Sequence, residues 1–189
     1  MATNEKPAEN KPNVKGPQTT AKRIQVPRPN KISRPEVDGI NRTAEGFLQL
    51  YYDLMDGSQR DARITLLYRD TSLMIWNGET ITGVEKIKEF LAKMPESKHE
   101  IQSWDCHPIP GSATTTSPPI LITVSGTVLH GTMPTKIPQT KKPGVLPRVF
   151  SQTFVLAHDP ASQPPATTSD QPASNEVYYV RSDTLRFVG

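Results

Sequence analysis

The chain has 189 residues, of which 34% are hydrophobic and 19 are proline, and its formal net charge is +3. Its length fits one domain of about 100–200 residues with a tail, and proline is about twice its ordinary share of roughly 5%, so we expect part of the chain not to pack. Residues 1–35 hold eight Lys and Arg against two Glu, a net charge of +6, whereas the remainder has 14 Lys and Arg against 17 Asp and Glu. This division excludes a uniformly basic nucleic-acid-binding domain.

Cys106 is the only cysteine, which excludes an intrachain disulfide and a zinc site built from thiolates. The polar first 16 residues lack the apolar stretch of a signal peptide, and the longest apolar runs, such as 120–122, fall far short of the roughly 20 residues that span a bilayer. We therefore expect a soluble, intracellular protein in a reducing compartment, without membrane insertion.

Residues 1–35 contain six prolines, no aromatic residue and only four large apolar side chains. These are too few to offset the entropy of ordering the segment, so we predict a disordered basic arm over 1–35 and a folded domain over 36–189. The first helix is indicated by apolar residues spaced by four and three, and it should run to about Asp56. Its apolar positions are Ile40, Ala44, Phe47, Tyr51 and Leu54.

Ser58 and Asp61 form the pattern of an N-cap, which predicts a short second helix carrying Ile64, Leu67 and Tyr68. Asn77-Gly78 separates residues 72–76 from 79–82 and tolerates the two positive φ angles of a type I′ turn, so we predict a hairpin. Thr82 and Glu85 have the spacing of a capping box, which predicts a third helix that Pro95 ends.

Four later stretches, near 99–109, 120–130, 149–158 and 177–188, are rich in β-branched and aromatic residues and predict strands. Two proline-rich connections, 131–148 and 159–176, are predicted to be mobile insertions between paired strands. Helices followed by a long antiparallel sheet make an α+β fold.

Several stretches in this order resemble the nuclear transport factor 2-like domain, and they resemble most closely the p15-like (NXT) family of small subunits of the mRNA export receptor. The resemblance covers about residues 40–188. Its main motifs are Phe47 to Asp56, Leu73 to Gly78, Trp104 to Pro108, Gly126 to Val128, Phe150-Ser-Gln-Thr-Phe154 and Ser182-Asp-Thr-Leu-Arg-Phe187.

The resemblance implies a cone in which three helices pack on a strongly bent antiparallel sheet. It also implies a partner, because in this family the small subunit pairs sheet to sheet with the nuclear transport factor 2-like domain of a larger, RNA-carrying, TAP-like subunit. The basic arm and the two insertions exceed the compact animal form and look more like the fungal version, whose extra loops are implicated in cargo contact.

The strand over 120–130 places one alternating set of residues toward the core, namely Ile120, Ile122, Val124 and Val128. The opposite set mixes apolar and hydroxyl side chains, as an interface does, although an ordinary half-exposed sheet face has the same composition. Leu185 and Phe187 should face the core, so Arg186 points to the other face, where the resemblance suggests an ion pair with the large subunit. The predicted partner interface comprises Leu121, Thr123, Ser125, Thr127, Leu129, Thr184 and Arg186.

No acidic residue lies between Cys106 and His158, and basic residues cluster in the insertion over 131–148. This positive field, together with the arm, favours contact with RNA phosphates, but aromatic residues for base stacking are missing, and a merely solubilising role is the alternative. The candidate RNA contacts are Lys22, Arg23, Lys136, Lys141, Lys142 and Arg148.

The same cone fold also houses isomerases and dehydratases, whose catalytic base would here be Asp53, Asp105 or His107, with Tyr51, Tyr52 or Tyr68 as hydrogen-bond donors. Ordinary solvated positions account better for the acids, and Trp76 and Trp104 are expected in the core rather than at a ligand. The sequence shows no metal-ligand spacing and no phosphate-binding glycine loop, so we expect no enzyme, no cofactor and no metal.

The sequence therefore predicts a non-catalytic subunit of a nuclear mRNA export heterodimer that stabilises the large subunit. Contacts with phenylalanine-glycine repeat proteins of the nuclear pore would be made mainly by that large subunit, and the chain would shuttle between nucleus, pore and cytoplasm. A homodimeric nuclear transport factor carrying the small GTPase Ran is the first alternative.

Overall fold

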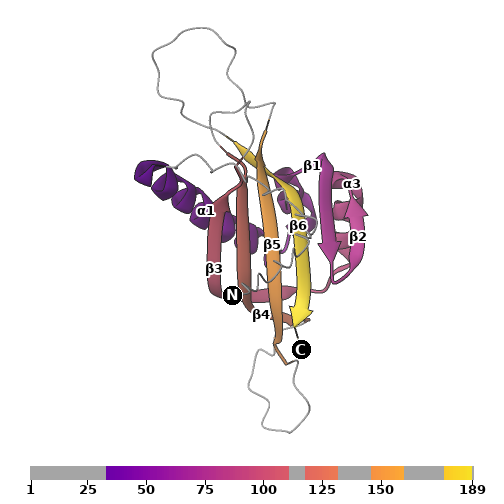
Figure 1. The fold of residues 1–189 in the computed structure, drawn as a ribbon. Helices are drawn as coiled ribbons and strands as arrows, with labels where there is room; N and C mark the ends of the chain where they lie inside the picture. The colour runs from indigo at the N-terminus through magenta and orange to yellow at the C-terminus, as the bar shows by residue number, and fades with distance from the viewer. Residues whose placement is uncertain (1–32, 111–117, 132–145, 160–176, 189) are drawn as a thin grey trace, which may run out of the picture.

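The computed structural model describes residues 33–110, 118–131, 146–159 and 177–188. Figure 1 shows the helices behind a curved sheet, with β5 and β6 running down the front. The elements are α1 (Arg34–Met55), α2 (Arg60–Arg63), the 3₁₀ turn η1 (Ile64–Leu67), β1 (Tyr68–Trp76), β2 (Glu79–Thr82), α3 (Val84–Lys93), β3 (Ser97–Pro108), β4 (Ile120–His130), β5 (Arg148–His158) and β6 (Tyr178–Val188). The predicted α+β class and the four late strands are confirmed.

Helix α1 begins at Arg34, before Ile40, the first of the predicted periodic residues. The backbone N–H and the hydroxyl of Ser33 both donate to the Glu36 carboxylate, at 2.8 and 2.7 Å. Pro35 lies in the first turn, where a missing N–H costs nothing. The predicted boundary between an arm at 1–35 and a domain from 36 is therefore wrong, because residues 33–35 already belong to the folded domain. The remainder of the predicted arm, 1–32, lies outside the described residues.

The second predicted helix is shorter than expected. Its N-cap is Gln59 rather than Ser58, and α2 changes into η1 after one turn. Tyr68 is not helical but begins β1. An extended backbone there brings the Tyr68 ring into the core, where its hydroxyl meets Asp183. A tertiary contact thus overrides the local helical pattern.

The hairpin of β1 and β2 is confirmed, with positive φ angles of 48° at Asn77 and 97° at Gly78. The predicted capping box of the third helix is wrong, because Thr82 belongs to β2 and Gly83 is the N-cap of α3. Gly83 has a φ of 89°, and its N–H donates to the Ser72 carbonyl at 3.0 Å. The chain reverses direction at a glycine because this backbone conformation is strained for other residues.

The six strands among the described residues form one sheet in the order β2-β1-β6-β5-β4-β3. Strand β6 pairs antiparallel with β5 but parallel with β1. The predicted wholly antiparallel sheet is therefore wrong at one pair, and the sheet is mixed. Strand periodicity predicts which face a residue takes but not which strand lies next to it, so this pairing could not be read from the pattern.

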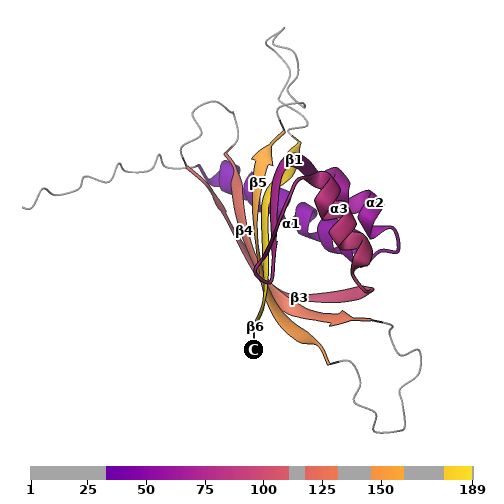
Figure 2. The ribbon, with the colours of Figure 1, turned by 90° about the vertical axis from the view of Figure 1, so that its right-hand side faces the viewer.

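The sheet bends strongly, and in Figure 2 the lower parts of β3, β4 and β5 curl beneath the helices. The register of β3 against β4 shifts between Ile101 and Ser103, next to Gly126 on the facing strand. A Cβ atom at Gly126 would lie 2.3 Å from the Glu100 carbonyl oxygen. A bulge facing a glycine lets the two strands approach closely while they turn, which produces the cone.

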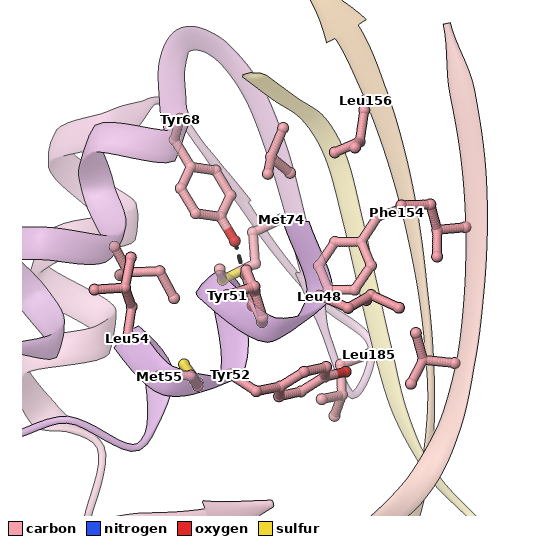
Figure 3. Close-up of a cluster of buried hydrophobic side chains, with 14 of the residues drawn as sticks. Leu48, Tyr51, Tyr52, Leu54, Met55, Tyr68, Met74, Phe154, Leu156 and Leu185 are labelled. Carbon is pink, nitrogen blue, oxygen red and sulfur yellow. Dashed lines mark hydrogen bonds between the residues drawn. The ribbon is translucent and has the colours of Figure 1, made fainter. Parts of the chain in front are cut away.

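The core lies between α1, α3 and the concave face of the sheet, and Figure 3 shows its aromatic and aliphatic side chains converging there. Ile120, Ile122, Val124 and Val128 are buried as predicted. Trp76 is also in the core, but Trp104 is 38% exposed, so its predicted core position is wrong. Trp104 is on β3, which is an edge strand of the sheet and has a neighbouring strand on one side only.

Both predicted insertions are shorter than expected at their ends. Arg148 is the first residue of β5, and Asp159 is buried and paired with the Arg69 guanidinium. The Asp159 N–H also donates to the Val177 carbonyl at 2.9 Å, which joins the two ends of the second insertion. Their inner parts, 132–145 and 160–176, lie outside the described residues.

Candidate functional site

The convex face of the sheet, which we call the outer face, carries alternating residues of five strands, and none of the helices that the structure describes covers it. Cross-strand register aligns them in three ladders. The ladders are His107-Leu121-Val155-Ser182-Leu73, Asp105-Thr123-Thr153-Thr184-Ile75 and Ser103-Ser125-Ser151-Arg186. Short hydroxyl and aliphatic side chains thus form a surface of mixed polarity, which is typical of a protein interface.

The predicted interface residues divide into two groups on this face. Leu121, Thr123, Ser125, Thr184 and Arg186 lie in the three ladders. Thr127 and Leu129 follow Gly126 along β4 and so lie beyond the bend. The face thus brings most of the predicted set together.

Arg186 is exposed, with the core residues Leu185 and Phe187 on either side of it in sequence, as predicted. Among the described residues its guanidinium has neither an ion pair nor a hydrogen bond to a side chain. Val149 and Val188, which pair across β5 and β6 in the next ladder, are 46% and 54% exposed. Arg186 therefore projects from the outer face beside exposed aliphatic surface.

The inner side of the same strands holds a buried polar cluster around Asp183, which is 0% exposed. Its Oδ2 accepts hydrogen bonds from the hydroxyls of Tyr51 at 2.9 Å and Tyr68 at 2.8 Å. Its Oδ1 accepts from Gln152 Nε2 at 2.7 Å, and Gln152 Oε1 accepts from the Tyr52 hydroxyl at 2.8 Å. The cluster joins α1, β1, β5 and β6 at the centre of the cone.

Burial raises the pKa of Asp183, and the hydrogen bonds from Gln152, Tyr68 and Tyr51 partly oppose this effect. Burial, with the nearby Asp183 charge second, also raises the pKa of Tyr51 and Tyr68. Each tyrosine hydroxyl therefore remains a donor whose hydrogen bond is already made within the cluster. This arrangement stabilises the fold and leaves no donor free to bind a developing oxyanion.

The structure brings Asp105 and His107 together, with His107 Nε2 3.0 Å from Asp105 Oδ2, but it places neither of them, nor Asp53, beside the three tyrosines. Asp53 is exposed on α1, and Asp105 with His107 lies on the outer face, whereas the three tyrosines point into the core. Sequence reasoning missed Asp183 and Gln152. The available signal was the spacing along each strand, because residues two apart share a face. Asp183 is two residues from Leu185, and Gln152 is two residues from both Phe150 and Phe154.

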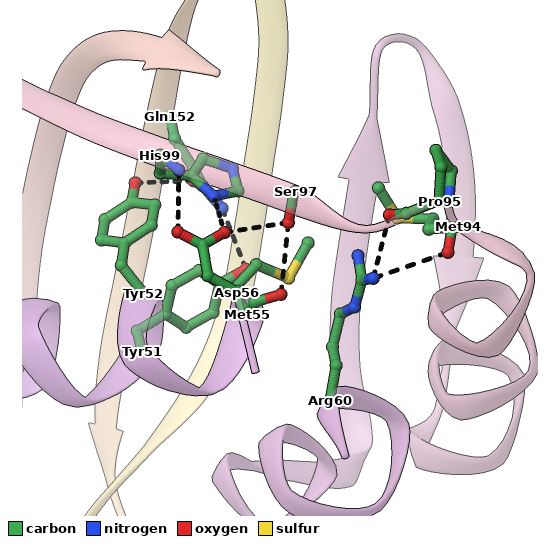
Figure 4. A network of polar contacts seen from close by, with 10 residues as sticks. All are labelled: Tyr51, Tyr52, Met55, Asp56, Arg60, Met94, Pro95, Ser97, His99 and Gln152. Atoms are coloured by element: carbon green, nitrogen blue, oxygen red, sulfur yellow. Dashed lines mark hydrogen bonds and ion pairs between the residues drawn. The ribbon is translucent and has the colours of Figure 1, made fainter. Parts of the chain in front are cut away.

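A second polar cluster ties the end of α1 to the start of β3 (Figure 4). Asp56 accepts hydrogen bonds from the His99 ring Nδ1 at 2.6 Å, the His99 N–H at 2.7 Å and the Ser97 hydroxyl at 2.9 Å. Burial acts to raise the pKa of Asp56, but the hydrogen bonds from His99 and Ser97 outweigh it, and the pKa is lowered. Asp56 is therefore a charged anchor between helix and sheet.

Arg60, also shown in Figure 4, donates to the carbonyls of Pro95 at 2.9 Å and Met94 at 3.5 Å. A cavity of about 460 Å³ lies between the Asp56 cluster and Arg60. It is lined by Asp56, Gly57, Ser58, Arg60, Glu96, Ser97, Lys98, His99 and Gly131. Its walls carry charges of both signs and few apolar side chains, which is unlike a typical small-molecule pocket.

Five of the six candidate RNA contacts, Lys22, Arg23, Lys136, Lys141 and Lys142, lie outside the described residues. Arg148 is described, and its guanidinium lies over the Phe187 ring, 3.6 Å from the centroid. Within the described ranges no group of His, Cys, Asp and Glu has the arrangement of a metal site. No described helix is long and apolar enough to cross a membrane.

Comparison with known proteins agrees with this fold. A family model described as the nuclear transport factor 2 (NTF2) domain matches residues 43–187. The chain belongs to this family. The predicted fold class and the resemblance on which it was based are therefore confirmed.

Within the family, the chain is similar to NTF2-related export protein 2 of Bos taurus, with 32% identity over 151 residues that cover 80% of this chain and 89% of the relative. It is 30% identical over 159 residues to the NTF2-related export protein of Caenorhabditis elegans, covering 84% and 94%. A chain of the solved structure described as the Chaetomium thermophilum Mex67 NTF2-like domain complexed with Mtr2 shares the fold, with a TM-score of 0.55, 17% identity and coverage of 79% and 99%. The two curated relatives are thus both named as NTF2-related export proteins.

Proposed function

We propose that the chain is the non-catalytic small subunit of a heterodimeric nuclear mRNA export receptor. Its outer face would bind the NTF2-like domain of a larger, RNA-carrying subunit and stabilise it. Two findings support this proposal: the similarity to NTF2-related export proteins, and a fold shared with a chain of a complex between an NTF2-like domain and a second protein. The chain would shuttle between nucleus and cytoplasm through the pore, with the large subunit making most contacts to phenylalanine-glycine repeats.

The observation that carries the proposal is the contrast on β6 between buried Asp183 and exposed Arg186. Asp183 has three donors, whereas Arg186 has no partner among the described residues and stands beside Val149 and Val188. A guanidinium has a planar fork of donors suited to a carboxylate. A partner sheet that brings an acidic residue to Arg186 would satisfy the cation and cover the exposed aliphatic side chains.

Lys136, Lys141, Lys142 and the basic arm are proposed to add non-specific RNA affinity to the heterodimer, with Arg148 at the root of the insertion. The proposal depends on charge alone, because the stretch from His107 to His158 contains no acidic residue. In this role the lysines would contact phosphates rather than bases.

A homodimeric transport factor carrying Ran is the alternative. The two functions differ in what the outer face binds, which is a different NTF2-like chain in the first case and a second copy in the other. An isomerase or dehydratase is disfavoured because the hydroxyls of Tyr51 and Tyr68 are already bonded to Asp183.

The test is to capture the tagged full-length chain from extract of its own cells and to identify the partner present in equal amount. We expect an NTF2-like domain of a larger chain, and an interface of about 1,600 Å² or more. Size-exclusion chromatography with light scattering should show a 1:1 heterodimer after co-expression. A stable monomer or homodimer that does not bind a large subunit would contradict the proposal.

A further inference from the structure

The three ladders of the outer face carry very little charge. Apart from His107, which is charged only if protonated, Arg186 and Asp105 are the only charged side chains in them. We propose that Asp105 is a second electrostatic contact of the partner interface and pairs with a basic side chain of the partner. This inference depends on the proposed function, since it specifies the chemistry of the partner at that same face.

The Asp105 carboxylate is held in one orientation by its own strand. Its Oδ1 accepts the Cys106 N–H at 2.9 Å, and its Oδ2 lies 3.0 Å from His107 Nε2. Cys106 itself points inward, where its thiol donates to Asn41 Oδ1 at 3.1 Å. An exposed acid fixed in this way loses little conformational freedom when it forms an ion pair.

These local contacts leave the acid open to a partner. The side chains of Asp105 and His107 are 75% and 70% exposed. Asp105 occupies the same ladder as Thr123, Thr153 and Thr184, so a flat sheet that covers those residues also reaches Asp105. A partner sheet would remove water from the parts of the carboxylate that the Cys106 N–H and the His107 ring leave exposed, and because this desolvation is costly, a cation or donor opposite Asp105 should replace that water.

Arg186 and Asp105 lie on β6 and β3, three strands and one ladder apart. With a strand spacing of about 4.8 Å, the separation between these positions is about 15 Å. The partner surface should therefore present an acidic and a basic side chain at a similar spacing. Two charges of opposite sign define the orientation of the partner sheet and disfavour a sheet docked in the reverse sense.

The experiment uses the full-length chain and the NTF2-like domain with which it co-purifies. Dissociation constants are measured for Asp105→Lys and Asp105→Asn, alongside a melting curve of each variant. We expect Asp105→Lys to weaken binding by about tenfold or more, and Asp105→Asn to weaken it less, with unchanged melting. Asp53→Lys is the matched control, since Asp53 is exposed on α1, and it should change affinity by less than about twofold.

Charge-reversal rescue completes the test. Basic residues of the partner's sheet are changed singly to Glu, and one of them should restore the affinity of Asp105→Lys while weakening the unmodified chain. If Asp105→Lys binds normally while Arg186→Asp binds weakly, this inference is wrong and the proposed function stands. If both variants bind normally, the outer face is not the interface and the proposed function itself fails.

Discussion

The two sides of strands β5 and β6 differ in how their polar residues are paired. On the inner side, Gln152 and Asp183 exchange hydrogen bonds with tyrosines from α1 and β1. On the outer side, residues that lie one to three positions from Gln152 or Asp183 in sequence face outward, namely Ser151, Thr153, Ser182, Thr184 and Arg186. Buried polar groups must be satisfied within the chain, whereas a cation such as Arg186 can be satisfied by another molecule. The inner side therefore determines stability, and the outer side is the place to look for binding.

Removal of the Asp183 carboxylate tests the inner side and should have the largest effect. Asp183→Ala leaves Tyr51, Tyr68 and Gln152 without their acceptor, and we expect a loss of about 3 to 5 kcal/mol in the free energy of unfolding. Urea unfolding followed by circular dichroism measures this loss. The exposed Asp53→Ala serves as control and should change stability by less than about 0.5 kcal/mol. Equal stability of the two variants would show that the cluster is not structural.

Reversal of the Arg186 charge tests the outer side. Arg186→Asp should weaken the heterodimer by about 2 to 5 kcal/mol of binding free energy if the ion pair is buried at the interface. The melting curve of the chain should stay unchanged, because no described side chain pairs with Arg186. Arg186→Lys keeps the charge but loses the planar fork, so it should cost less. An unaltered dissociation constant for Arg186→Asp would place the interface elsewhere.

The carboxylates of half-buried Asp56 and buried Asp183 should respond to pH in opposite directions. The folded pKa of Asp56 is lowered, so its stabilising effect is present above the unfolded pKa of about 3.9 and is lost as the pH falls through the folded pKa. The folded pKa of Asp183 is raised, so its contribution is present below about 3.9 and is lost as the pH rises through the folded pKa.

Asp56→Asn should therefore flatten the acid loss of stability, which can be measured by urea unfolding at a series of pH values from about 3 to 7. Asp183→Asn should not flatten it. The same acid slope in Asp56→Asn as in the unmodified chain would show that the His99 contacts do not lower the pKa of Asp56.

The smallest expected effect concerns the lysines of the insertion. Each neutralised phosphate of single-stranded RNA contributes roughly 0.7 to the slope of log affinity against log salt. Replacement of Lys136, Lys141 and Lys142 by Ala in the heterodimer should lower that slope by up to about 2 units. Arg186→Asp, in contrast, should weaken assembly of the heterodimer and leave this slope unchanged. No change of slope in the triple variant would identify the lysines as solvated charges only.

Local sequence patterns predicted well those elements whose conformation depends only on residues next to one another in the chain. Asn77-Gly78 specifies its own turn, and the strand over 120–130 was predicted to the residue because β-branched side chains alternate along it. The prediction was wrong at Thr82, where Gly83 with its positive φ begins α3, and at Tyr68, whose contact with the distant Asp183 accompanies an extended backbone. It was also wrong by one residue at Ser58, since Gln59 is the N-cap of α2. The outward direction of Arg186 followed from period-two alternation and is confirmed.

The sequence by itself determined the class of fold, the faces of the strands and the family, because these depend on periodicity and on motifs in a fixed order. Only the tertiary structure decided that β6 lies between β1 and β5, that Asp183 receives three hydrogen bonds, and that Asp105 and Arg186 share one face. These facts depend on which strands become neighbours. Strand pairing joins residues more than a hundred positions apart, and no local pattern specifies such a partner.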